Sequence, residues 1–187
     1  EEAVEDNLYV KLSTRYTKAL ARSMANTKQV KGANILNRAF NTSYLGGDAK
    51  ALCVTDHTTL SGDQKNALST AADLNETSLE QALIDIADMK DERGLKIALR
   101  GMKMLIPVNL QFVAERLMKS AGRVGTADND VNAIKSMGMV PEGYVVNNFL
   151  TDTDAWFIKT DAPNGLKHFT RAPIRTAMEG DFDTGNV

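Results

Sequence analysis

The sequence is short of the residues that form covalent links or hold metal ions. It contains one cysteine, Cys53, and only two histidines in 187 residues. One thiol excludes a disulfide within this chain and favours synthesis in a reducing compartment. Zinc sites need three or four protein ligands, mostly Cys and His, so the composition predicts no metal site and no cofactor.

Long apolar runs are missing as well. No stretch of about 18 consecutive apolar residues occurs, so we expect no transmembrane helix, and we expect no signal peptide. The chain begins at Glu1 without a methionine and stops at Val187 with no terminal signal. We therefore expect it to be a piece of a longer polypeptide, whose intact mass would exceed 20.4 kDa.

Acidic residues are absent from residues 7–47, although the whole chain carries a net charge of -2. That net charge argues against a dedicated nucleic-acid binder, but one basic face remains possible. The segment has seven cations, which are Lys11, Arg15, Lys18, Arg22, Lys28, Lys31 and Arg38. The distribution of charge is therefore more informative than its sum.

The same segment has helical periodicity. On a helical wheel its apolar stripe comprises Leu8, Leu12, Tyr16, Ala19, Leu20 and Ser23. Lys11, Arg15, Lys18 and Arg22 cluster on the adjoining side. We predict one helix from Asp6 to Phe40, roughly 50 Å long, which is more than the width of a domain of this size. Such a helix must lean on other parts of the protein or on other subunits.

Beyond Gly46 and Gly47 the pattern indicates short helices and strands. A short buried segment is predicted over Ala49–Val54, and residues 55–75 are predicted to be mostly loop. Thr77 and Glu80 have the spacing of a capping box before a helix over Ser78–Lys90. Alternating apolar residues predict a strand from Met102 that ends near Pro107.

From residue 110 onward the sequence again predicts both helices and strands. A helix is predicted over Leu110–Ala121 with Asn109 as its cap, and at most a short helix over Val131–Met137. Tyr144–Val146 is predicted to be a strand, and Ala155–Lys159 to form a hairpin with Leu166–Arg171. Helices and strands mix without a regular βαβ alternation, which favours an α+β fold over a doubly wound sheet.

Two candidate sites for chemistry are weak. Cys53, Asp56 and His57 could form a thiolate–imidazole pair or half a metal site, but a buried cysteine and a histidine at a loop edge explain them more simply. Three Asp-x-Asp pairs also occur, at Asp128/Asp130, Asp152/Asp154 and Asp181/Asp183. No calcium-loop pattern follows them, and each is better explained as a turn-closing group.

Two further motifs do not support a ligand site. Residues 122–126 lack the lysine and the spacing of a phosphate-binding loop. Trp156 and Phe157 lie on a predicted strand, where large rings usually pack in a core. We therefore predict that the protein is not an enzyme.

Seven stretches, taken together and in order, resemble the major capsid proteins of tailed bacteriophages. They are Lys28–Phe40, Gly46–Asp48, Lys50–His57, Gly125–Asn132, Leu150–Phe157, Gly165–Phe169 and Gly180–Thr184. The resemblance implies the Hong Kong 97-like shell fold. Residues 1–45 would be the spine helix of the peripheral domain, 46–176 the axial domain, and 177–187 a return strand to the peripheral domain. The family's extended loop, N-terminal arm and last peripheral strands would lie outside this chain.

The resemblance also implies a function. The chain would assemble with copies of itself, as hexamers and pentamers, into the icosahedral head that encloses double-stranded DNA. It would be a virion protein assembled in the bacterial cytoplasm, with scaffold, portal or decoration proteins as further partners and no membrane contact. Lys11, Arg15, Lys18 and Arg22 would face the packaged DNA or pair with acidic groups of neighbouring subunits, and both possibilities stay open.

Two other functions make different predictions. A DNA-binding architectural protein that uses the basic N-terminal helix would be a monomer or dimer whose affinity falls steeply with salt. An enzyme built on Cys53 and His57 would be inactivated by Cys53→Ser, whereas a capsid protein would assemble almost normally with that change.

Overall fold

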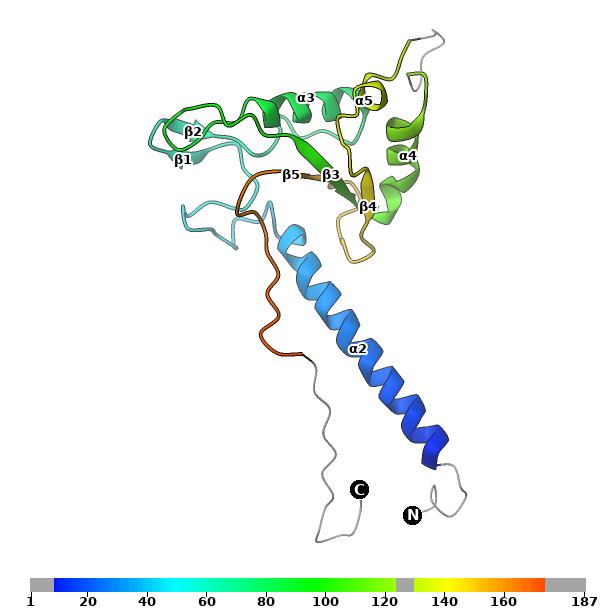
Figure 1. Ribbon diagram of the computed structural model, residues 1–187. Coiled ribbons are helices and arrows are strands. Elements are labelled where there is room, and N and C mark those ends of the chain that lie inside the picture. Colours follow the sequence, from blue (N-terminus) through cyan, green and yellow to red (C-terminus); the bar gives the residue numbers. More distant parts are fainter. Residues whose placement is uncertain (1–8, 124–129, 174–187) are drawn as a thin grey trace.

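The computed structural model describes residues 9–123 and 130–173 and shows a long helix that projects from a body of mixed helices and strands (Figure 1). The helix is α2, Tyr9–Asn37. The body, residues 46–160, holds every other helix and strand of the described chain. The mixture of helices and strands confirms the predicted α+β class.

Helix α2 confirms the predicted long helix over most of its length. Its 29 residues span about 43 Å. It ends at Asn37 and not at Phe40, and the expected start at Asp6 lies outside the described residues. Side chains from Thr14 to Gly32 are exposed, and burial begins only at Ala33. Among the residues that the structure describes, the fully buried part of α2 therefore lies near its C-terminal end.

The body is built on a three-stranded sheet with order β4-β3-β5. Central strand β3 (Gly101–Ile106) pairs in parallel with β4 (Tyr144–Val146) and antiparallel with β5 (Phe157–Thr160). Met104 lies opposite both Tyr144 and Ile158. The predicted strands at 102–107 and 144–146 are thus confirmed.

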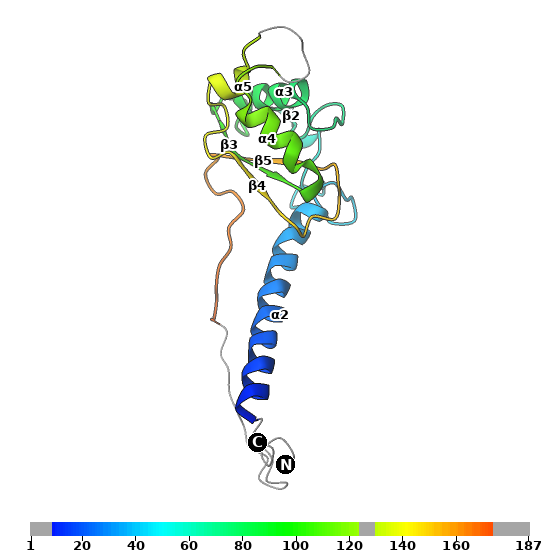
Figure 2. The same cartoon turned by 90° about the vertical axis from the view of Figure 1, so that its right-hand side faces the viewer.

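Short helices cover one face of this sheet, while α2 approaches from the opposite side (Figure 2). They are α3 (Glu76–Ala87), the 3-10 turn η1 (Val108–Leu110), α4 (Gln111–Lys119) and α5 (Ala133–Ser136). The core between helices and sheet contains Leu74, Leu79, Leu83, Met104, Ile106, Ala114, Leu117, Ile134 and Val140. Apolar burial on this scale supplies most of the stability of a small body.

The helix caps differ from the prediction. Helix α3 begins with a capping box formed by Asn75 and Ser78, and not by Thr77 and Glu80. The Asn75 side chain accepts from the Ser78 amide, and the Ser78 hydroxyl accepts from the Asn75 amide. Asn109 does not cap α4, because the chain after Pro107 first makes the η1 turn and Asn109 lies inside it. Asn132 caps the short helix α5 and donates to the carbonyl of Leu117 at 2.7 Å.

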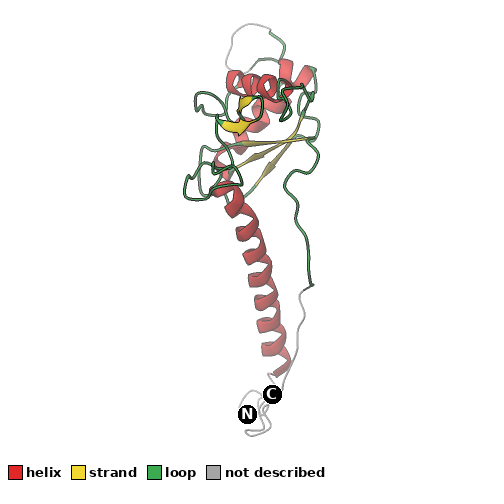
Figure 3. Ribbon diagram, turned by 90° about the vertical axis from the view of Figure 1, so that its left-hand side faces the viewer, coloured by secondary structure: helices red, strands yellow, loops and turns green. Residues whose placement is uncertain are grey.

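The prediction that residues 55–75 are mostly loop is confirmed apart from one short hairpin, and the predicted pairing of 155–159 with 166–171 is wrong. Within residues 55–75, β1 (His57–Thr59) and β2 (Gly62–Gln64) form a small antiparallel hairpin whose turn needs the φ of 113° at Gly62. The predicted hairpin of 155–159 with 166–171 does not form. Strand β5 pairs with β3 instead, and 166–171 is irregular, with Phe169 82% exposed. Figure 3 shows this segment as a loop that runs beside α2.

The joint between α2 and the body combines close packing with two hydrogen bonds. Ala33, Ala39 and Ala51 are almost fully buried, so the backbones approach closely. Phe40 stacks on Phe157 with ring centroids 5.8 Å apart. The Asn37 side chain donates to the Phe149 carbonyl at 3.0 Å and accepts from the Thr151 amide at 3.1 Å. These contacts set the direction in which α2 leaves the body.

Replacing Asn37 with alanine should loosen this joint. The change removes both hydrogen bonds and should lower the free energy of unfolding of the joint by about 1–3 kcal/mol. Hydrogen exchange of the Thr151 amide should accelerate accordingly. Asn26, which is exposed on the same helix, is the matched control, and Asn26→Ala should leave that exchange rate unchanged. Equal exchange in the two variants would contradict the proposed anchor.

Replacing Gly101 with alanine should destabilise the core. A Cβ there would lie 2.8 Å from Leu83 Cδ2 and 3.1 Å from Ile158 Cγ2. Leu83 is itself buried, so its methyl has no open space to enter, and we expect a loss of about 1–3 kcal/mol. The midpoint of urea-induced unfolding measures this loss of stability. Gly47→Ala, where a Cβ would have no neighbour within 4 Å, should leave the midpoint almost unchanged.

Candidate functional site

The basic face of α2 comprises Lys11, Arg15, Lys18 and Arg22. Their spacing places them on one face along about three turns, roughly 16 Å. All four side chains are exposed, and with Thr14 and Ala19 they line a shallow open groove on the helix. The structure therefore confirms that a helix carries these residues on one face.

No acidic group within the described chain neutralises this face. The ion pairs found among residues 9–123 and 130–173 all involve other cations. Cations three and four residues apart on a helix repel, at a cost of about 0.2–0.5 kcal/mol per pair. Within the described residues, the basic face is thus a positive surface without compensating acids, which a polyanion or carboxylates from elsewhere would stabilise.

The apolar stripe beside the basic face is also uncovered. Of its large side chains, Tyr16 is 67% exposed and Leu20 55%. The sequence predicts that such a stripe packs on the protein itself or on other subunits, and the described part of this chain does not cover it. A helix with both faces open depends on contacts from outside the chain described here.

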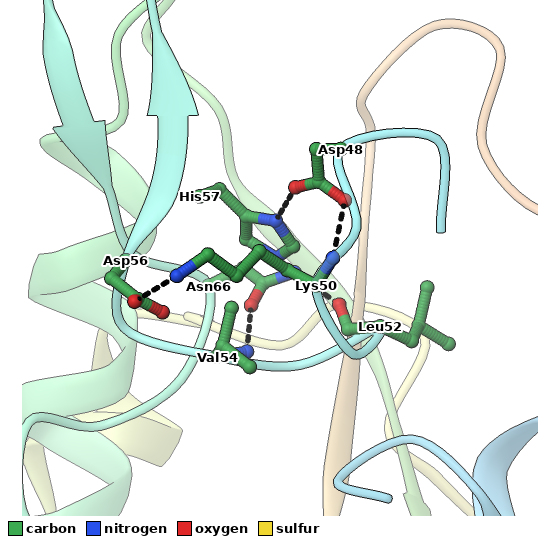
Figure 4. A network of polar contacts seen from close by, with 7 residues as sticks. All are labelled: Asp48, Lys50, Leu52, Val54, Asp56, His57 and Asn66. Carbon is green, nitrogen blue, oxygen red and sulfur yellow. Dashed lines mark hydrogen bonds and ion pairs between the residues drawn. The ribbon is translucent and has the colours of Figure 1, made fainter. Parts of the chain in front are cut away.

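Cys53 and His57 do not form a reactive pair. His57 Nδ1 lies 2.5 Å from an oxygen of Asp48, while Lys50 pairs with Asp56 (Figure 4). This interaction with His57 lowers the pKa of the Asp48 carboxyl. Cys53 is half-buried, and its burial raises the pKa of its thiol, which disfavours the nucleophilic thiolate.

This polar network is structural. The Asn66 side chain donates to the Leu52 carbonyl at 2.7 Å and accepts from the Val54 amide at 2.9 Å, so it joins residues 50–56 to the segment after β2 (Figure 4). Sequence analysis missed Asp48 as the partner of His57, because the contact depends on a loop closure that no spacing rule predicts. Among the described residues, no three His, Cys, Asp or Glu side chains are grouped closely enough to hold a metal ion.

The remaining candidates also have structural roles where they are described. The Asp152 carboxylate accepts from the amides of Asp154 and Ala155, as a turn-closing aspartate does. Trp156 donates from Nε1 to the Ala72 carbonyl at 3.1 Å. Asp128, residues 124–126, the Asp181/Asp183 pair and the expected return strand at 177–187 lie outside the described residues.

Comparison with known families identifies the class of this protein. A family model described as phage capsid protein matches residues 1–187, so the chain belongs to that family. It is accordingly a structural protein of the bacteriophage virion. Comparisons with curated proteins and with solved structures found no match. In the parts of the chain that the structure describes, no helix is long and apolar enough to cross a membrane.

The contact between Asp48 and His57 can be tested by titration. The Asp48 carboxyl should titrate below its ordinary pKa of 3.8, so the contribution of this contact to stability is present above that value and is lost as the pH falls through the lowered pKa. His57→Phe should raise the midpoint towards 3.8, as followed by NMR of the carboxyl carbon. His168 is an exposed matched control, and His168→Phe should leave the Asp48 midpoint unchanged.

Proposed function

We propose that this capsid protein is the major shell subunit of a tailed bacteriophage and assembles with copies of itself, as hexamers and pentamers, into an icosahedral head around double-stranded DNA. The observation that carries the proposal is helix α2, which extends about 43 Å with an apolar stripe and a basic face that the described chain leaves open. A lone soluble domain gains nothing from such a helix, whereas a shell subunit has neighbours to cover it.

The proposed arrangement is Hong Kong 97-like. Residues 1–45 would form the spine helix of a peripheral domain, residues 46–176 the axial domain, and residues 177–187 a strand returning to the periphery. The sharp division between the projecting helix and the body supports this arrangement. Assembly would take place in the host cytoplasm, with scaffold, portal or decoration proteins as further partners.

We further propose that the basic face meets the packaged DNA. The four cations carry no sequence-reading geometry, and a face without acidic residues suits the sequence-independent neutralisation of phosphates. The competing possibility is that they pair with carboxylates of neighbouring subunits. Replacing the four cations with neutral residues would impair DNA packaging in the first case and subunit assembly in the second.

The shell proposal is tested by electron microscopy of the full-length protein. Purified protein at high concentration should form closed particles of one size class, or rings of five and six subunits. Protein that stays monomeric or dimeric under every assembly condition, and binds DNA with a steep salt dependence, would favour an architectural DNA-binding protein instead.

The basic face is tested by replacing Lys11, Arg15, Lys18 and Arg22 with glutamine. If all four contact phosphates, the slope of log K against log salt for DNA binding should fall by about 3–4, and the packaged genome should shorten. The matched control replaces Arg100, Lys159, Lys167 and Arg171, which are exposed outside α2. Unchanged DNA binding together with damaged assembly would show that the basic face contacts subunits.

A further inference from the structure

The body has two ends with different surfaces. The β1–β2 hairpin and the loop 88–97 form one end, and helices α4 and α5 form the other (Figures 1 and 2). Both ends expose large apolar side chains although the body has a core of its own. Surfaces of this kind mark interaction sites more often than scattered single residues do.

The hairpin end displays apolar side chains on two ordered turns. Leu60 is 81% exposed, Leu95 67% and Ile97 45%. The two turns touch, because a Cβ added at Gly94 would lie 3.2 Å from the Cβ of Ser61. The hairpin end therefore presents one apolar surface made of two neighbouring turns.

Hydrogen bonds hold these turns in shape. The Asp91 carboxylate accepts from the amides of Arg93 and Leu95 at 2.9 and 2.8 Å. The Asp91 amide in turn donates to the Leu95 carbonyl at 2.7 Å. On the neighbouring turn, Thr59 Oγ1 donates to the Gly62 carbonyl at 2.6 Å. Leucines fixed at the tips of ordered turns cannot fold back to the core, so their exposure is preorganised for contact with a partner.

The helical end displays a different set. Phe112 is 68% exposed, Met137 70% and Val131 67%. Phe112, Arg116 and Lys119 follow one another at i, i+4 and i+7, so they form one outward stripe of α4, and all three are exposed. The Tyr144 hydroxyl donates to Glu115 at 2.6 Å, which ties α4 to β4 and keeps the stripe in place.

The two ends also differ in charge. Helices α4 and α5 carry Arg116, Lys119 and Lys135 against the single acid Glu115 and are net positive. The hairpin end is net negative by one charge, with Asp63, Asp88, Asp91 and Glu92 against Lys90, Arg93 and Lys96. Two hairpin ends, or two helical ends, would bring like net charges together, whereas a hairpin end against a helical end brings opposite ones together.

We propose that the hairpin end of one copy binds the α4 stripe of the next copy, with Leu60 and Leu95 against Phe112. The contact is head to tail, so each copy uses both ends, and repetition generates a ring if the rotation closes. The inference rests on the proposed shell function for its biological setting, while the contact itself is argued from the two surfaces. It assigns to the body the residues that would join neighbouring subunits.

Cysteine cross-linking tests this contact directly. The background is Cys53→Ser, which removes the only natural thiol, and the test variant adds Leu60→Cys and Phe112→Cys. Both positions are exposed, so the changes should leave the body folded. Under oxidising conditions, the double variant should give a ladder of dimers, trimers and longer oligomers, in free protein at high concentration and in assembled particles.

The single variants distinguish head-to-tail from head-to-head contact. Leu60→Cys and Phe112→Cys should each remain uncross-linked alone and should form a dimer when mixed. A dimer from Leu60→Cys alone would overturn the proposal, because it would show hairpin ends in contact with each other. Leu166→Cys with Phe112→Cys is the matched control, since Leu166 is 72% exposed but outside the hairpin end, and it should give no ladder.

Charge reversal gives a second readout. Arg116→Glu with Lys135→Glu should weaken association of free subunits about tenfold or more, and Asp63→Lys with Glu92→Lys on the partner should restore it. If wild-type protein forms shells but the double cysteine variant gives no ladder, the contact is wrong and the shell proposal survives. A ladder without shells would support the contact and overturn the shell proposal, and the absence of both would overturn both.

Discussion

The joint between the last turns of α2 and the body fixes the direction of the long helix and of the basic face that it carries. Three buried alanines let the backbones approach closely, the Phe40–Phe157 stack closes the contact, and Asn37 bonds both a carbonyl and an amide of residues 149–151. Because α2 has 29 residues and is held at one end, a small change of angle at the joint displaces its far end by a large distance. The direction of the basic face relative to the body is therefore decided by a few contacts around Asn37.

Membership of the phage capsid protein family offers an explanation for the exposed surfaces of α2 and of the body. In the shell that we propose, surfaces left open within one chain would be covered by neighbouring copies or by the contents of the shell. The basic face and apolar stripe of α2, and the two ends of the body, are such surfaces. Each is held by ordered backbone, and order in a surface before contact lowers the entropic cost of assembly.

The elements that sequence analysis predicted correctly are those with strong local signals. Helix α2 has an uninterrupted 3.6-residue pattern without proline, and β3 alternates apolar residues up to Pro107. Errors arose where the decision was not local. The segment 157–160 has the composition of a strand, but its composition does not identify its pairing partner. The partner is β3, some 55 residues earlier in the chain, and not the nearby segment 166–171. The cap lies at Asn75 because Asn75 and Ser78 accept reciprocally from each other's amides, whereas Thr77 lies inside the helix.

The amino-acid sequence is enough to predict the phage capsid family and the long basic helix with Lys11, Arg15, Lys18 and Arg22 on one face, because family motifs and helical spacing can be read without a structure. Three features become visible only in the folded chain. His57 pairs with Asp48 and not with Cys53, the basic face has no partner among the described residues, and particular apolar side chains remain exposed at the two ends of the body. Burial and pairing are relations between distant segments, and they exist only after the sheet and its helices have packed.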